Sequence, residues 1–113
     1  MSRQCLALDL KDDPVLIAEY ERLHQQIWPQ ISAHLRQHGV VDMQIWRLGT
    51  RLFMVMETAP EFSAEAFAQA GASEPRVQEW EALMWRFQQP TPWTQPGEKW
   101  AAMTQIFSLQ HSP

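Results

Sequence analysis

The order in which apolar residues change their spacing along this chain restricts its fold more than any other feature. Some segments have apolar residues at alternate positions, as half-buried strands do, and others have them three or four positions apart, as helices do. The strand-like segments are residues 3–10, 40–48, 52–57 and 100–109, and the helical segments are residues 14–37, 61–72 and 74–88. The sequence therefore predicts the order strand, helix, strand, strand, helix, strand.

Proline and glycine residues indicate where these elements begin and end. Pro14 follows Asp13, a good helix-capping residue, and suits the first helical position because no N–H is needed there. Pro29 lies inside a helical pattern, so we expect that helix to kink or restart near residues 27–29 and to end at Gly39. The proline-rich residues 89–99 predict a loop, in which Trp93 indicates contact with the rest of the protein, and residues 111–113 predict a short tail.

The predicted order is that of the ferredoxin-like split βαβ arrangement, an α+β fold with a four-stranded antiparallel sheet. Helices would cover one face of this sheet, and the other face would carry Met, Ile, Phe and Trp side chains. Soluble proteins rarely leave such a large apolar patch in water. We therefore expect a second copy of the chain or a ligand to cover this face, and a homodimer follows naturally.

Length and charge limit the function further. The 113 residues suffice for one domain, which we expect to span residues 1–113. The net charge of -4, with no basic stripe, argues against nucleic acid as a partner, and no apolar stretch is long enough to span a membrane. The single cysteine, Cys5, and the lack of an N-terminal targeting segment lead us to expect a cytoplasmic protein.

The aromatic content is unusual for a chain of this size, with six Trp, five Phe and one Tyr. Trp and Tyr side chains bury a large area, so an aromatic core or dimer interface is one explanation. A pocket walled by indole rings is the other explanation, and it would suit the apolar face of a sugar or another flat ligand. Composition leaves both explanations open.

His24 is the best candidate for chemistry. Tyr20 precedes it by four residues and therefore shares its helix face, and Glu21, three residues before it, is placed to bias the charge of the imidazole. His34 has no partner at helical spacing, so we expect it on the surface. We find no spacing typical of a metal site, a nucleophile motif or a phosphate loop, and we expect no metal or cofactor. Proton transfer by His, Tyr or a carboxylate is the chemistry that remains.

Residues 19–31 read EYERLHQQIWPQI and are followed by Leu35 and by His38-Gly39. This run closely resembles the L-rhamnose mutarotase family, and the resemblance extends more loosely over the whole chain. It implies a dimeric α+β barrel that interconverts the α and β anomers of a monosaccharide, a 6-deoxy-L-hexose. It also implies that His24 is the catalytic proton donor and that Tyr20 contacts the sugar.

Two substrate-binding positions depart from the family pattern. The family has a Tyr in its second strand and two consecutive Trp residues in its last helix, and these positions fall on Met43 and on Trp80-Glu81 here. We expect Trp80 to stack on the sugar and Glu81 to bind hydroxyls or act as a second proton-transfer group, with core packing and a solvated helix face as the respective alternatives. Residues 90–100, PTPWTQPGEKW, resemble a branch of the family associated with L-fucose, so L-fucose stands beside L-rhamnose as the expected sugar.

Two other classes of function are compatible with the predicted fold. Small dimeric α+β barrels include haem-degrading and quinone-forming monooxygenases, in which His24 would be a ligand or a base. A dimer that binds a 6-deoxysugar without accelerating anomer exchange is the second alternative.

Overall fold

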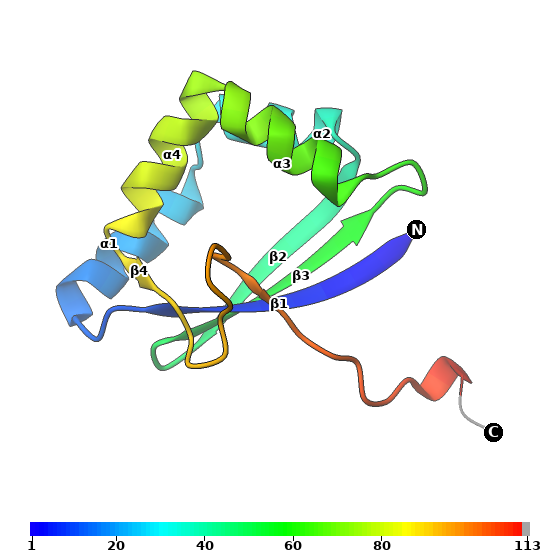
Figure 1. Ribbon diagram of the computed structural model, residues 1–113. Helices are drawn as coiled ribbons and strands as arrows, with labels where there is room; N and C mark the ends of the chain where they lie inside the picture. The colour runs from blue at the N-terminus through cyan, green and yellow to red at the C-terminus, as the bar shows by residue number, and fades with distance from the viewer. Residues whose placement is uncertain (112–113) are drawn as a thin grey trace.

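The computed structural model describes residues 1–111 and contains an antiparallel sheet with its α-helices against one face (Figure 1). The strands are β1 (Ser2–Leu10), β2 (Val40–Leu48), β3 (Arg51–Thr58), β4 (Gln88–Gln89) and β5 (Ala101–Ala102). The helices are α1 (Pro14–Gln25), α2 (Pro29–Gln37), α3 (Ala64–Ser73), α4 (Pro75–Trp85) and the short 3₁₀ helix η1 (Leu109–His111). Residues 112 and 113 of the expected tail lie outside the described residues.

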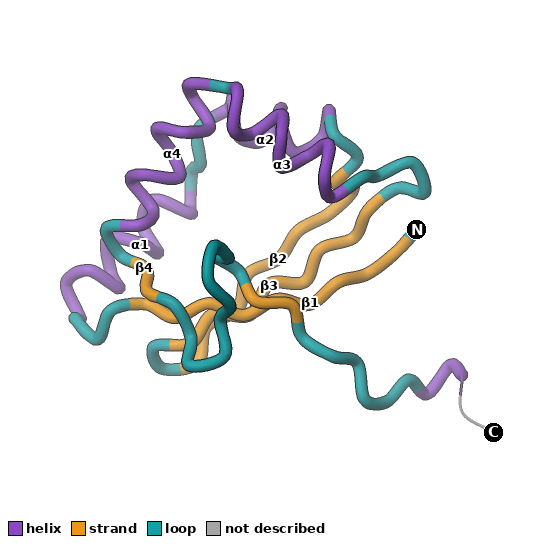
Figure 2. Tube along the Cα trace, viewed as in Figure 1, coloured by secondary structure: helices purple, strands orange, loops and turns teal. Residues whose placement is uncertain are grey.

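The strand order is β2-β3-β1-β4, and β5 also pairs with β1. The long strands β1 and β3 lie side by side at the centre, with Leu6 opposite Met54 and Leu8 opposite Leu52. The hairpin of β2 and β3 forms one side of the sheet (Figure 2). This order and the placement of the helices confirm the predicted split βαβ arrangement.

The last position of the sheet differs from the prediction. Two strands of two residues, β4 and β5, pair with different parts of β1 in place of one long fourth strand. The strand predicted for residues 100–109 is wrong beyond residue 102: the N–H of Met103 still donates to the carbonyl of Cys5, and the chain then leaves the sheet (Figure 1). Ile106 is 95% exposed. Alternating apolar residues predict a strand, but a strand also needs a neighbouring edge, and among the described residues the sheet pairing of this segment ends with β5.

The predicted helix boundaries are confirmed around Pro29. Helix α1 ends at Gln25, and α2 begins at Pro29 after Trp28, its N-cap residue. At the start of α1, the Asp13 carboxylate accepts hydrogen bonds from the backbone N–H groups of the next turn. Gly39 has a φ of 90°, the left-handed conformation expected after a helix.

Helix α4 is shorter than predicted. It ends at Trp85, whereas the apolar spacing had suggested a helix as far as Gln88. Phe87 fits that spacing because the chain makes one more turn, and the Phe87 N–H donates to the Met84 carbonyl. Gln88 then pairs in register with Leu10 as part of β4. The sheet edge therefore takes Gln88 out of the helix and fixes its backbone beside β1.

The two faces of the sheet differ in what covers them. On the helix side, Leu8, Leu10 and Leu52 are fully or almost fully buried, and Leu10 and Leu52 belong to the main core. Side chains on the opposite face include Cys5 and Trp46, which are both exposed. No helix among residues 1–111 has the length and the apolar composition that crossing a bilayer requires.

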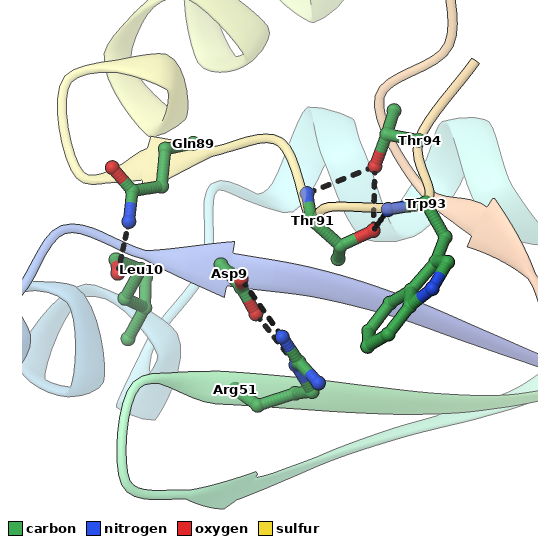
Figure 3. Close-up of polar contacts among 7 residues, drawn as sticks. All are labelled: Asp9, Leu10, Arg51, Gln89, Thr91, Trp93 and Thr94. Carbon is green, nitrogen blue, oxygen red and sulfur yellow. Dashed lines mark hydrogen bonds and ion pairs between the residues drawn. The ribbon is translucent and has the colours of Figure 1, made fainter.

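The proline-rich loop lies along the edge of the sheet, and Figure 3 shows how it is attached. The hydroxyl of Thr94 accepts a hydrogen bond from the backbone N–H of Thr91, which closes a tight turn around Trp93. The indole of Trp93 stacks on the guanidinium of Arg51, with 5.1 Å between the guanidinium carbon and the ring centroid. Arg51 in turn forms a two-pronged ion pair with the mostly buried carboxylate of Asp9. The contact with Arg51 is the one expected for Trp93, and it holds the indole away from the helix side of the sheet.

We predict that Asp13→Ala lowers the free energy of unfolding by about 1 kcal/mol, because the first turn of α1 loses its side-chain cap. Asp12→Ala is the matched control, since the neighbouring carboxylate makes no capping bond to the start of α1. Urea denaturation at one fixed protein concentration measures both. Equal stability of the two variants would contradict the capping role.

Candidate active site

A cavity of about 440 Å³ lies between the helices and the helix-facing side of the sheet. Helix α1, strand β2 and helix α4 each contribute to its lining. The five residues expected to form a site all line it: Tyr20, His24, Met43, Trp80 and Glu81. The fold therefore brings together residues that the sequence places up to 61 positions apart, since the set runs from residue 20 to residue 81.

His24 is held by its own helix. Its Nδ1 lies 2.8 Å from the backbone carbonyl oxygen of Tyr20, one turn earlier. Because a carbonyl only accepts hydrogen bonds, Nδ1 carries the proton in the neutral ring, and Nε2 keeps its lone pair. Burial lowers the pKa of His24 below its usual 6.5, although the bond to the Tyr20 carbonyl opposes this shift. The imidazole is therefore mainly neutral at pH 7.

Tyr20 is only 3% exposed, and its ring centroid lies 4.2 Å from that of His24. The Nε2 of Gln88 donates a hydrogen bond of 3.2 Å to the phenol oxygen. Burial raises the pKa of Tyr20 to about 12, so the phenol keeps its proton at neutral pH. The cavity thus holds a neutral acid and a neutral base in direct contact.

The indole of Trp80 forms an aromatic wall beside His24, with 5.7 Å between the ring centroids. Behind it, Trp28 makes an edge-to-face contact with Trp80 at 5.0 Å, and the guanidinium of Arg76 covers the Trp28 ring at 3.6 Å. The sequence left an aromatic pocket and an aromatic interface open. The structure places Trp80 in the lining of the cavity and leaves Trp46 exposed on the other face of the sheet.

Glu81 forms an ion pair that the sequence did not reveal. The Nζ of Lys99 lies 2.6 Å from Glu81 Oε2 and 3.3 Å from the Glu81 backbone oxygen. Both side chains line the cavity, so the loop that carries Lys99 contributes to its wall. Lys99 was missed because it lies in a proline-rich loop, where no periodic pattern indicates the direction of a side chain, and Gln88 was missed because its spacing indicated the end of a helix.

Two expectations, one about His34 and one about Glu21, were wrong. His34 is not a surface residue: it is 9% exposed, lines the cavity, and has its ring centroid 5.3 Å from that of Phe67. The break at Pro29 starts a new helix, α2, which packs against α4, so spacing counted from α1 does not describe its faces. Glu21 pairs with Arg47 of β2, and it is not among the groups that shift the pKa of His24.

The described residues contain no group of three or more His, Cys, Asp or Glu side chains placed to hold a metal ion. The cavity instead offers two imidazoles, one phenol, two carboxamides and one ion pair, set in a largely apolar lining. Such groups donate and accept protons and hydrogen bonds. The fold and the cavity together define a small-molecule-binding α+β protein equipped for acid and base chemistry.

Comparison with solved structures supports this fold. An L-rhamnose mutarotase from Formosa agariphila superposes with a TM-score of 0.72 and 18% identity, over 96% of this chain and 99% of that one. Tetracenomycin F2 cyclase from Streptomyces glaucescens, a type-II polyketide cyclase, superposes with a TM-score of 0.65 and 17% identity, over 96% and 98% of the two chains. The predicted α+β fold of the barrel type is thereby confirmed.

Comparison of sequences is more specific. The sequence model of the L-rhamnose mutarotase family matches residues 3–109. The L-fucose mutarotase of Xanthomonas campestris pv. campestris is 46% identical over 114 aligned positions, which cover 99% of this chain and 91% of that protein. The chain therefore belongs to the L-rhamnose mutarotase family and is an isomerase.

Proposed function

We propose that this chain interconverts the α and β anomers of a 6-deoxy-L-hexose by opening and closing the sugar ring. The observation that carries the proposal is the contact of a neutral imidazole, His24, with a neutral phenol, Tyr20, beside the indole of Trp80 in one cavity. An imidazole transfers protons near neutral pH, and an indole suits the apolar face of a deoxysugar. The identity to a relative named L-fucose mutarotase supports the same reaction.

Ring opening moves one proton from the anomeric hydroxyl to the ring oxygen while the bond between the anomeric carbon and the ring oxygen breaks. In the proposed mechanism, Nε2 of His24 accepts the proton from the hydroxyl, and the imidazolium then donates it to the ring oxygen. Both oxygens are bonded to the anomeric carbon, so the same nitrogen can accept the proton from one and donate it to the other. The aldehyde turns about its bond to the next carbon, and the reverse transfers close the ring on its other face.

The lowered pKa of His24 suits this sequence of steps. The neutral ring is the resting form at pH 7 and is ready to accept a proton, and the buried imidazolium that forms is a stronger acid than one in water. Positioned acid–base catalysis of this kind contributes about 10² to 10⁴-fold in rate. No net proton is gained or lost over a cycle, so His24 returns to its resting form.

The other lining residues are proposed to bind the sugar. Tyr20 donates a hydrogen bond to a sugar oxygen, Trp80 stacks on the apolar face, and Met43 packs beside the ring. Glu81 accepts hydrogen bonds from sugar hydroxyls and is also the candidate for a second proton-transfer group. Its ion pair with Lys99 places a donor next to that acceptor at the cavity wall.

We further propose that residues 1–113 work as one domain in the cytoplasm. All the α-helices of the described chain lie against one face of one sheet (Figure 2), and Cys5 is a free thiol. A free thiol is common in a reducing compartment.

We expect His24→Asn to lower anomer exchange by about 10²-fold or more, because the variant keeps a hydrogen-bonding side chain but cannot carry a proton. Tyr20→Phe should be intermediate, since it loses one hydrogen bond worth about 0.5 to 1.5 kcal/mol. Saturation-transfer NMR of the two anomeric protons measures exchange at matched enzyme concentration.

His38→Asn is the control for His24→Asn. His38 follows the last residue of α2 and does not line the cavity, whereas His34, which the sequence had suggested to be a surface residue, does line it. Circular dichroism verifies folding. A folded His24→Asn protein with undiminished exchange would exclude the mechanism and direct attention to Glu81, and a wild-type protein that binds the sugar without exchange would favour the non-catalytic alternative.

We expect L-fucose to be exchanged at least as fast as L-rhamnose. Met43 and Glu81 occupy positions where the family resemblance implies aromatic side chains, and the loss of two such walls changes how the sugar ring lies against Trp80. Saturation-transfer NMR with L-fucose, L-rhamnose and their mirror images compares the rates, the mirror images serving as controls. Exchange of L-rhamnose alone would contradict the expected preference.

We propose that the chain forms a homodimer through the sheet face that carries no helices. Trp46 is 63% exposed on this face, and Leu48 is exposed at the end of the same strand. The segment after β5 adds the exposed side chains of Ile106 and Phe107. A soluble monomer rarely leaves so many large apolar side chains in water.

Light scattering at micromolar concentration should give about twice the 13.2 kDa mass of one chain. Trp46→Glu should shift the mass toward that of the monomer, because a carboxylate in the apolar interface would be desolvated. Val15→Glu is the control: Val15 is also an exposed apolar residue, but it lies on α1, on the other side of the sheet. A wild-type protein that stays monomeric would contradict the proposed dimer.

A further inference from the structure

Gln88 lies beside Tyr20 at the edge of the cavity and is only 3% exposed. Its backbone is held in β4 opposite Leu10, and its Nε2 donates to the phenol oxygen of Tyr20, 68 positions away in the chain. Its other amide atom, Oε1, is completely buried and has no hydrogen-bond partner among the described residues. A buried carbonyl without a partner is costly, and the hydrogen bond from Nε2 to Tyr20 is the interaction that the carboxamide makes in this orientation.

The orientation of the carboxamide decides what Tyr20 can do. A phenol has one proton to donate and an oxygen that accepts. With Nε2 of Gln88 on the phenol oxygen, the Tyr20 proton is free to point at a ligand in the cavity. If the carboxamide turned by half a revolution, Oε1 would accept that proton, and Tyr20 could offer a ligand only its lone pairs.

We propose that Gln88 is a positioning residue that keeps Tyr20 a hydrogen-bond donor toward the sugar. The inference rests on the proposed anomer exchange and adds a residue to it. Ring opening places negative charge on the ring oxygen before the imidazolium of His24 protonates it. A donor aimed at that oxygen binds it more strongly as the charge develops, because hydrogen bonds to a charged acceptor are about twice as strong as neutral ones. Gln88 thereby supports the rate through Tyr20 without touching the reacting atoms.

The first test measures whether Gln88 acts through Tyr20. Gln88→Met has a similar size and removes the hydrogen bond, and we expect it to lower the exchange rate at saturating L-fucose by about 3- to 10-fold. In a Tyr20→Phe background, the same substitution should change the rate by less than about twofold, because there is no phenol proton left to direct. Equal losses in both backgrounds would overturn the positioning role, since a merely structural effect of Gln88 does not depend on the Tyr20 hydroxyl.

The second test uses the direction of the hydrogen bond. In Gln88→Glu, an ionised carboxylate can only accept, so it captures the Tyr20 proton, and the exchange rate at pH 8 should fall to that of Tyr20→Phe. The rate relative to wild type should rise as the pH falls, because the protonated carboxyl can donate again, and burial moves this transition above the usual Glu pKa of about 4.3. Titratable groups of the other elements face the same cavity, namely His24 of α1, His34 of α2, Glu81 of α4 and Lys99 of the loop. Because wild type contains them too, the ratio of the two rates isolates the new carboxyl.

A ratio that does not change with pH would overturn the inference, provided that circular dichroism shows a folded variant. The outcomes also separate this inference from the proposed function. If the wild-type protein exchanges no anomers, the proposed function fails. If wild type exchanges them and Tyr20→Phe slows the exchange, but the Gln88 variants act independently of Tyr20, only the role of Gln88 fails.

Discussion

The contact between the indoles of Trp28 and Trp80 joins the two helical regions at the point where His24 lies. Pro29 ends the hydrogen bonding of α1 and starts α2, so the chain at Trp28 is free of a regular helix and its indole can turn toward α4. The guanidinium of Arg76 covers the outer face of that ring. An edge-to-face pair of aromatic rings contributes about 0.5 to 1.5 kcal/mol beyond the area that it buries, so this contact adds to the core packing that holds the helices above the sheet. Trp28 thereby supports from behind the Trp80 indole that lines the cavity beside His24.

The same burial that stabilises the cavity sets its chemistry. Desolvation lowers the pKa of His24 and raises that of Tyr20, and both shifts favour the uncharged side chain. The ionised groups that line the cavity, Glu81 and Lys99, neutralise each other across a short ion pair near the solvent. An apolar lining can therefore hold acid and base groups without burying an unpaired charge, which would cost several kcal/mol. Proton transfer to and from a neutral ligand is the kind of reaction such a cavity favours.

Local patterns in the sequence predicted the features of the fold that local interactions determine. Capping at Asp13 and the break at Pro29 act within one helical turn, and so does the pairing of Tyr20 with His24 on one face of α1. The sequence could not predict contacts that depend on which edge of β1 a distant segment meets. Gln88 looked helical by its spacing because only the hydrogen-bonded edge beside Leu10 takes it out of the helix. Lys99 has no pattern at all, and its side chain is placed by the path of the loop.

Hydrogen bonds and apolar walls select sugars in different ways. An apolar wall distinguishes ligands that differ by one methylene only by about 10- to 200-fold, whereas a site that hydrogen-bonds a hydroxyl rejects an analogue without it by about 10⁴ to 10⁵-fold. Deoxyhexoses of equal size differ in where their hydroxyls point, so an apolar wall distinguishes them only by setting how the sugar ring lies, and the groups beside the wall then bind or reject each hydroxyl. In this cavity, Trp80 supplies a wall that suits any such sugar. The acceptor of Glu81 and the donor of Lys99 lie 2.6 Å apart, a spacing at which neighbouring hydroxyls of a pyranose can bond to both. The selectivity that we propose for the cavity therefore resides on its polar side, where α4 meets the proline-rich loop.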